Sequence, residues 1–171
     1  MKTKKDKKFT ILFVCSGNAC RSPMAEGLLR KKLFQQFKTK LKIHSAGTLG
    51  ISGSPATPNA ITVAKEKGVD ISGHISKGIT ANIVEEADII FVMADIHKNF
   101  FTNNFPGIKN KVYLLTNFEV ENNEQKNKPV KDPIGENLTF YRQVINHIER
   151  ELERFIPWLQ VLIEKKLKDR I

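Results

Sequence analysis

Uninterrupted apolar stretches mark the strands that the sequence predicts. Residues 9–14 read Phe-Thr-Ile-Leu-Phe-Val and residues 88–93 read Asp-Ile-Ile-Phe-Val-Met, so apolar side chains occupy consecutive positions in both stretches. A strand covered on both faces has this pattern, whereas a half-exposed strand alternates apolar and polar residues. Both stretches are therefore expected inside a parallel sheet. Residues 41–46 alternate and residues 111–115 form a last short apolar run, which predicts two further strands.

Segments with helical spacing of apolar positions alternate with these strands. The first of them opens with Ser22, expected as the helix N-cap, and Pro23, which suits the first turn; it continues to about Phe37. Strands alternating with helices predict an α/β fold, a three-layer domain over residues 9–171 with a parallel sheet between helices. The shorter segments expected as helices are residues 59–67, ended by Gly68, residues 80–86 and residues 96–104.

The C-terminal part of the chain carries one long amphipathic pattern. From Leu138 onward, apolar residues recur every three or four positions, and we expect Pro157 to interrupt or kink the resulting helix. The segment beyond Pro157 allows two interpretations, a partner-binding or interfacial face, or simple packing against the domain, of which packing is favoured. The residues of that face are Trp158, Leu159, Leu162 and Ile163, with Lys165, Lys166 and Lys168 beside them.

The charge balance invites a nucleic-acid interpretation, which its distribution weakens. The chain holds 28 Lys and Arg against 18 Asp and Glu, a formal charge of +10. Residues 1–8 contain five Lys and one Asp, so +4 of that charge falls in a basic tail that we expect to be disordered. The remaining positive charge is scattered among acidic residues, a distribution typical of a soluble surface or of a protein with anionic ligands. We therefore expect no nucleic-acid partner.

The length of the apolar runs and the number of cysteines indicate the cellular compartment that we expect for the chain. No apolar run approaches the roughly 20 residues needed to cross a bilayer, so stable membrane insertion is not expected. Two cysteines cannot build a disulfide framework, which predicts a cytoplasmic chain with reduced thiols. The oligomeric state is expected to be a monomer or a weak dimer.

The stretch that points to chemistry is Cys15-Ser16-Gly17-Asn18-Ala19-Cys20-Arg21-Ser22-Pro23, between the first strand and the first helix. Loop and helix-start amides at such a junction point inward and carry partial positive charge, which suits a phosphate. Arg21 adds a bidentate fork for two phosphate oxygens. The same field favours the nucleophilic thiolate of Cys15, to which Ser22 can donate a hydrogen bond.

A cysteine followed by five residues and an arginine also occurs by chance in many proteins. In that alternative, Cys15 is a buried structural cysteine and Arg21 a surface residue. The preceding strand, the following helix and the Gly17-Asn18 pair make that alternative much weaker. The loop lacks the Gly-Lys-Ser/Thr of a Walker A motif. We expect no metal and no cofactor, because the two cysteines and the four histidines form no complementary ligand set. Those histidines are His44, His74, His97 and His147.

Val14–Pro23 resembles the signature of the low-molecular-weight protein tyrosine phosphatase family, and the similarity extends over nearly the whole chain. Three further landmarks of that family occur in the same order and at matching separations. They are Ser45-Ala46-Gly47, Gly73-His74 and Asp132-Pro133. The resemblance implies a four-stranded parallel sheet flanked by helices, and metal-free hydrolysis of phosphorylated protein through a cysteinyl-phosphate.

Roles follow from the resemblance by position. Cys15 would be the nucleophile, Arg21 the phosphate clamp, and Asp132 the acid that protonates the leaving group and then activates water. The residues expected to bind phosphate are Ser16, Gly17, Asn18, Ala19, Cys20, Arg21 and Ser22. The residues expected to support the loop are Asn18, Ser22, Ser45 and His74.

The chain departs from tyrosine-specific members of the family at the substrate slot. Ile134-Gly135 follows Asp132-Pro133 where those members carry aromatic residues, and Ala19 stands where they usually carry a larger aliphatic residue and phosphoarginine-directed members carry Thr. Phosphotyrosine is the predicted substrate and phosphoarginine the alternative. The predicted slot residues are Ala19, Leu49, Ile51 and Ile134.

Two other activities are less favoured. A thioredoxin-coupled arsenate reductase shares this loop but passes a disulfide to cysteines further along, and this chain has none after Cys20. An inactive phosphate-binding module is disfavoured because Cys15, Arg21 and Asp132 are all retained. Cys20 lies at the other end of the loop from Cys15, and we expect it to act as a resolving thiol after oxidation.

Overall fold

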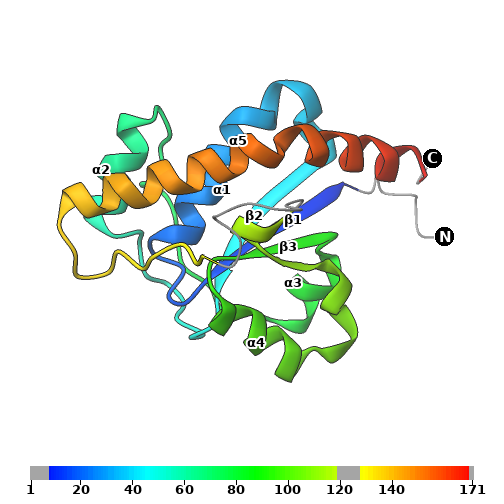
Figure 1. The fold of residues 1–171 in the computed structure, drawn as a ribbon, viewed down its shortest axis with the longest axis horizontal. Coiled ribbons are helices and arrows are strands. Elements are labelled where there is room, and N and C mark those ends of the chain that lie inside the picture. Colours follow the sequence, from blue (N-terminus) through cyan, green and yellow to red (C-terminus); the bar gives the residue numbers. More distant parts are fainter. Residues whose placement is uncertain (1–7, 119–127, 170–171) are drawn as a thin grey trace.

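The structure is a computed structural model that describes residues 8–118 and 128–169. Four parallel strands form one sheet in the order β2-β1-β3-β4 (Figure 1). The strands are β1 (Phe9–Cys15), β2 (Leu41–Gly47), β3 (Ile89–Val92) and β4 (Val112–Leu114). The chain moves from β1 to β2 on one side and returns to β3 on the other. In such sheets ligands bind beyond the carboxyl ends of the strands, at the reversal of strand order.

Alternate residues of β1 enter two different cores, which explains its continuous apolar sequence. Ile11 and Phe13 pack with residues of the first and last helices, while Leu12 and Val14 pack in a second cluster with Phe101. One face of the sheet therefore carries α1 (Arg21–Phe37), α2 (Pro58–Glu66) and α5 (Leu138–Lys168), and the other carries α3 (Ala81–Glu86) and α4 (Asp95–Asn104). The predicted three-layer α/β fold is confirmed.

Short 3-10 helices complete the described elements and lie at junctions. They are η1 (Lys38–Lys40), η2 (Pro106–Lys111) and η3 (Leu115–Asn117). Residues 1–7 of the expected basic tail, residues 119–127 of the polar loop, and residues 170–171 lie outside the described residues.

Two local predictions are wrong. Helix α1 begins at Arg21 with Cys20 as its N-cap, so Ser22 is not the cap but a first-turn residue whose hydroxyl serves the loop instead. Helix α5 runs without interruption through Pro157, so the expected interruption is wrong, while the expected kink stays a prediction. Packing on both sides of the proline holds the helix: Phe155 stacks on Phe91 with ring centroids 4.9 Å apart, and Leu159 and Ile163 are fully buried.

The segment beyond Pro157 packs mainly as part of the domain. Leu159 and Ile163 belong to the main core, and Leu162 is partly buried against it, whereas Trp158 is exposed. Among the described helices, none is long and apolar enough to span a membrane.

Candidate active site

The loop between β1 and α1 lies at the carboxyl edge of the sheet. Strand β1 ends at the buried Cys15, whose carbonyl accepts the Thr48 amide at 3.0 Å, and helix α1 begins six residues later at Arg21. Asn18 adopts the left-handed conformation with φ of 55°, which asparagine tolerates better than most residues. This turn lets the chain reverse within a few residues and present successive amides to one side.

Hydroxyl and amide groups surround the Cys15 sulfur. Cys15 Sγ lies 3.0 Å from Ser22 Oγ, and Asn18 Nδ2 donates to that same oxygen at 2.9 Å. Because the Ser22 oxygen accepts from Asn18, its hydroxyl hydrogen is available for the sulfur. A hydroxyl aimed at sulfur stabilises the thiolate, the reactive form of a nucleophilic cysteine.

Asn18 is fixed by partners from three separate segments. Its Nδ2 also donates to Ser45 Oγ at 2.9 Å, its Oδ1 accepts the Lys77 amide at 3.0 Å, and its carbonyl lies 2.6 Å from His74 Nε2. The structure thus brings all four predicted loop-supporting residues together. We call Asn18, Ser22, Ser45 and His74 the supporting cluster.

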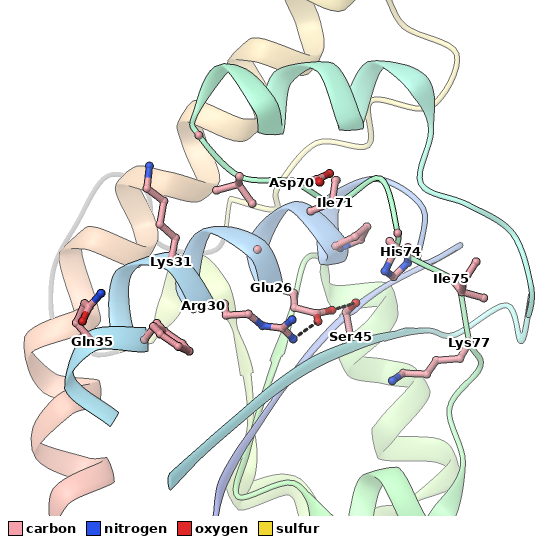
Figure 2. Close-up of a pocket in the computed structure, with 16 residues that line it drawn as sticks. Glu26, Arg30, Lys31, Gln35, Ser45, Asp70, Ile71, His74, Ile75 and Lys77 are labelled. Carbon is pink, nitrogen blue, oxygen red and sulfur yellow. Dashed lines mark hydrogen bonds and ion pairs between the residues drawn. The ribbon is translucent and has the colours of Figure 1, made fainter. Parts of the chain in front are cut away.

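Glu26 and Lys77 extend this cluster and were not predicted. Ser45 donates to Glu26 Oε2 at 2.6 Å, and Arg30 donates to Glu26 Oε1 at 2.6 Å, as the dashed lines in Figure 2 show. These residues line a hollow of about 760 Å³ between α1 and the segment 68–77, which also includes His74 and Lys77. No local pattern in the sequence indicates that Glu26 on α1 would contact Ser45 on β2.

Gly47 is required by close packing against the loop. A Cβ at this position would lie 2.5 Å from the Ser16 carbonyl oxygen and 2.9 Å from the Asn18 nitrogen. Any larger residue would therefore push the loop away from β2. This contact gives the Ser45-Ala46-Gly47 landmark a physical reason.

Arg21 connects the loop to the segment that carries Asp132. The guanidinium is 4% exposed; its Nη2 donates to Asp132 Oδ2 at 2.7 Å and its Nη1 to the Val130 carbonyl at 3.1 Å. Within the described residues, Nε of Arg21 is buried and has no hydrogen-bond partner. Buried donors are normally paired, so this one suits an oxyanion held in the loop.

Asp132 is more accessible than the arginine it contacts. Its side chain is 42% exposed, and its Oδ1 accepts the Ile134 amide at 3.2 Å, which holds the Asp132-Pro133 turn. A phosphate dianion arriving at Arg21 competes with Asp132 for the guanidinium. The carboxyl group would then be free to exchange a proton with a leaving group.

The predicted slot residues are apolar, and three of the four are exposed. Leu49 is 67% and Ile134 61% exposed, and Ile51 is also exposed. The Leu49 amide donates to the Ser16 carbonyl at 3.1 Å, so this side chain stands beside the loop, and Ile134 stands beside Asp132. Ala19 is partly buried, and its carbonyl accepts the Thr57 amide at 2.9 Å. We call Ala19, Leu49, Ile51 and Ile134 the rim.

Cys20 has a different environment from Cys15. It is a free thiol, 3.4 Å from both Thr57 Oγ1 and the Tyr141 hydroxyl. Burial raises the pKa of Cys20 despite these hydrogen bonds, and burial likewise raises the pKa of Tyr141 to about 12. Cys20 is therefore mostly a neutral thiol at neutral pH.

His97 is a third unpredicted residue of the site. It lies in the first turn of α4, its Nε2 is 2.9 Å from Ser16 Oγ, and burial lowers its pKa to about 4. The sequence separates Ser16 from His97 by 81 residues and offers no local signal for the contact. The described residues contain no group of three or more potential metal-ligating His, Cys, Asp or Glu side chains.

A cysteine at a strand end, a buried arginine at a helix start and an aspartate from a distant turn define a phosphatase of the cysteine-dependent class. Residues 10–169 match the family described as low molecular weight phosphotyrosine protein phosphatase, and the chain belongs to this family. A curated relative, the probable low molecular weight protein-tyrosine-phosphatase EpsP of Ralstonia nicotianae, is 34% identical over 153 residues, which cover 90% of this chain and 97% of the relative.

Solved structures of the same family are similar throughout. The YwlE arginine phosphatase from Geobacillus stearothermophilus superposes with a TM-score of 0.80 at 31% identity, covering 92% of this chain and 96% of that one. A low molecular weight protein tyrosine phosphatase from T. tengcongensis gives 0.77 at 31% identity, covering 88% and 99%. The predicted family and enzyme class are confirmed, while the relatives carry both tyrosine and arginine phosphatase names.

Proposed function

We propose that the enzyme hydrolyses phosphotyrosine in proteins, with Cys15, Arg21 and Asp132 as its catalytic residues. One observation carries this assignment. The fold gathers in one place a thiol hydrogen-bonded to Ser22 at 3.0 Å and a buried guanidinium that holds Asp132 at 2.7 Å. These are the nucleophile, the phosphate clamp and the acid that phosphoester hydrolysis needs.

The reaction proceeds in two steps. The Cys15 thiolate attacks phosphorus, the bond from phosphorus to the tyrosyl oxygen breaks, and Asp132 gives its proton to that oxygen. Asp132, now a carboxylate, takes a proton from water as the water oxygen attacks phosphorus, and the bond to sulfur breaks. Phosphate leaves and the thiolate is restored. Loop amides and Arg21 stabilise the charge on the phosphoryl oxygens in both steps.

The rim favours an aromatic substrate over a short one. Aliphatic side chains at Leu49 and Ile134 stand exposed beside the loop and beside Asp132 and can contact both faces of a flat ring by dispersion. A phosphoserine side chain is too short to bring its phosphate to the loop while the peptide stays outside. Phosphotyrosine is long enough for both.

Phosphoarginine is the second candidate, and the turn after Asp132 favours it. Ile134-Gly135 lacks the aromatic wall of tyrosine-specific members, and the exposed Asp132 carboxylate could accept hydrogen bonds from a guanidinium. Several matched proteins of the same family carry arginine phosphatase names, among them the YwlE of Geobacillus stearothermophilus named above.

Parallel turnover of phosphotyrosine, phosphoserine and phosphoarginine peptides tests this assignment, each with the wild type and with Cys15→Ser. We expect phosphotyrosine to be hydrolysed best and the serine variant to bind phosphate without turnover. Wild-type-like activity in Cys15→Ser would overturn the mechanism. A preference of about tenfold or more for phosphoarginine, roughly 1.4 kcal/mol in transition-state binding, would overturn the tyrosine assignment.

We also propose redox control by Cys20 and a cytoplasmic site of action. Both cysteines are free thiols in the structure, which suits a reducing compartment. Mild peroxide should convert Cys15 to a sulfenic acid that condenses with Cys20 to a disulfide, releasing water. Mass spectrometry should show the reversible Cys15–Cys20 link. Because the raised pKa of Cys20 keeps it a neutral thiol, the disulfide should form slowly. Recovery of Cys15 sulfinate with free Cys20 would contradict the proposal.

A further inference from the structure

His97 is a buried histidine, and both of its ring nitrogens lie within hydrogen-bond distance of a partner. It lies in the first turn of α4 and is 1% exposed. Its Nδ1 lies 3.1 Å from the backbone nitrogen of Ala94, and its Nε2 lies 2.9 Å from Ser16 Oγ in the phosphate loop. Helix α4 is thereby joined to the catalytic loop through a single side chain.

The hydrogen-bond partners determine the protonation of the ring. A backbone N–H can only donate, so Nδ1 must accept and carries no hydrogen. The neutral ring then bears its hydrogen on Nε2 and donates it to Ser16 Oγ. Burial, reinforced by the positive charge of Arg21 and opposed by Asp132, lowers the pKa of His97 to about 4, which keeps this neutral form at neutral pH.

Ser16 receives a second donor from the catalytic arginine. Nη2 of Arg21 lies 3.4 Å from Ser16 Oγ, and a guanidinium can only donate. The Ser16 oxygen therefore accepts from His97 and from Arg21, which uses both of its lone pairs. Its own hydroxyl hydrogen remains for a third partner, and a phosphate oxygen held by Arg21 would be such an acceptor.

We propose that His97 is a positioning residue of the phosphatase reaction, which acts by holding Ser16 as an acceptor for Arg21 and turning the Ser16 hydroxyl toward the phosphate. This inference rests on the proposed function. His97 does not itself exchange protons with substrate, because its Nδ1 is occupied by the Ala94 amide and its Nε2 by Ser16. It acts on phosphate only through Ser16 and Arg21.

Two substitutions separate the two contacts of the ring. The amide oxygen of Asn can replace Nδ1 as acceptor for Ala94 but leaves no donor near Ser16. The longer Gln places an amide nitrogen near the position of Nε2 and leaves nothing near that of Nδ1. His97→Asn thus keeps the helix contact and removes the Ser16 contact, and His97→Gln does the reverse.

The expected results differ in activity and in stability. His97→Asn should lower kcat/KM for an aryl phosphate by about tenfold and weaken inhibition by inorganic phosphate, because one charge-assisted contact to phosphate loses its support. Its melting temperature should stay near that of the wild type. His97→Gln should recover most of the lost activity although its melting temperature falls. Wild-type activity in His97→Asn, or losses of activity that follow melting temperature across both variants, would overturn the inference.

A double-mutant cycle with Ser16→Ala tests the route through Ser16. If His97 acts through that hydroxyl, adding His97→Asn to Ser16→Ala should change kcat/KM by less than about twofold, since coupled residues are not additive. Fully additive losses would overturn the inference.

Direct binding of inorganic phosphate, followed by calorimetry, separates this inference from the proposed function. A wild type that binds phosphate but hydrolyses none of the phosphopeptides refutes the function alone, and the binding constants of the His97 variants then decide the inference. Equal phosphate affinity in the wild type and His97→Asn would refute the inference while the function stands.

Discussion

The supporting cluster and the rim both adjoin one short loop, and they are built differently. Asn18, Ser22 and Ser45 are buried, and each makes at least two hydrogen bonds to groups from other parts of the site. The side chains of Leu49 and Ile134 are mostly exposed and have no such bonds among the described residues.

This difference indicates which part of the site can vary. Changing a member of the supporting cluster leaves buried polar partners unpaired, which costs stability as well as loop geometry. Changing a rim residue alters only what an incoming side chain meets. Solved structures named tyrosine and arginine phosphatases share this fold. We therefore expect the difference in substrate to lie at the rim.

Asp132 belongs to neither group but contacts both the buried Arg21 and the backbone of the rim residue Ile134, and replacing it should have the largest effect. Its carboxylate pairs with the buried Arg21 while its side chain is 42% exposed. Asp132→Asn should lower kcat by roughly 10²–10⁴-fold, the usual contribution of a general acid. The loss should be smallest for aryl phosphates whose leaving group needs no proton. Steady-state kinetics over a series of leaving groups measures this, and an equal loss across the series would contradict the role.

The next largest effect should separate cluster from rim directly. Asn18→Ala leaves the Lys77 amide without its acceptor and removes the donor to the Ser22 and Ser45 hydroxyl oxygens, so the free energy of unfolding should fall by about 2–4 kcal/mol. Leu49→Ala, the matched control at an exposed position, should change it by less than about 0.5 kcal/mol. Urea denaturation of both variants measures the difference. Comparable losses of unfolding free energy in the two variants would show that the supporting cluster and the rim do not differ in their contribution to stability.

The sequence was sufficient for the fold and for the loop because both are local patterns. The apolar run of β1 indicated a strand covered on both faces, and Cys15–Pro23 is one continuous segment. It failed where packing overrides a local rule. Pro157 breaks helices in isolation, yet the burial of Phe155 and Leu159 on either side of it holds α5 continuous.

Long-range contacts could not be predicted from the residues alone. His74 and Asp132 were placed by resemblance, since an isolated Gly-His or Asp-Pro pair has no specific meaning. Nothing in the sequence joins His97 to Ser16, or Glu26 to Ser45, because these contacts depend on how α4 and β2 meet the loop. Candidate residues came from motifs, and their partners came only with the tertiary structure.

Two buried histidines, His97 beside the phosphate loop and His44 on β2, should make the protein sensitive to acid. Burial lowers the pKa values of His44 and His97 to about 4, from about 6.5 in the unfolded chain. The unfolded state then binds more protons between these values, so their contribution is complete above pH 6.5 and is lost as the pH falls toward 4. Each should cost about 2 kcal/mol of unfolding free energy by pH 5.

Denaturation at pH 7 and pH 5 tests this expectation with one variant per histidine. His97→Gln should be less stable than the wild type at pH 7, yet it should lose less stability between the two pH values. His44→Asn should do the same through a separate site on β2. A pH dependence unchanged in both variants would assign the acid sensitivity to another group, such as the partly buried His147, whose pKa is also lowered by burial.

The smallest expected effect concerns the rim and decides substrate preference. Ile134→Tyr would place an aromatic ring beside Asp132, where it can pair with a phosphotyrosine ring. The pair should strengthen transition-state binding by about 1 kcal/mol, so kcat/KM for phosphotyrosine peptides should rise roughly fivefold. Ile134→Leu, a matched aliphatic control, should leave kcat/KM unchanged.

Ala19→Thr should shift the ratio of activities toward phosphoarginine, because a hydroxyl at that position offers the guanidinium a hydrogen-bond partner that Ala19 lacks. Neither substitution should alter unfolding, since Ile134 is exposed and Ala19 bonds through its backbone. If both leave the ratio of activities unchanged, specificity does not lie at the rim, and the division of the site into a fixed support and a variable rim is wrong.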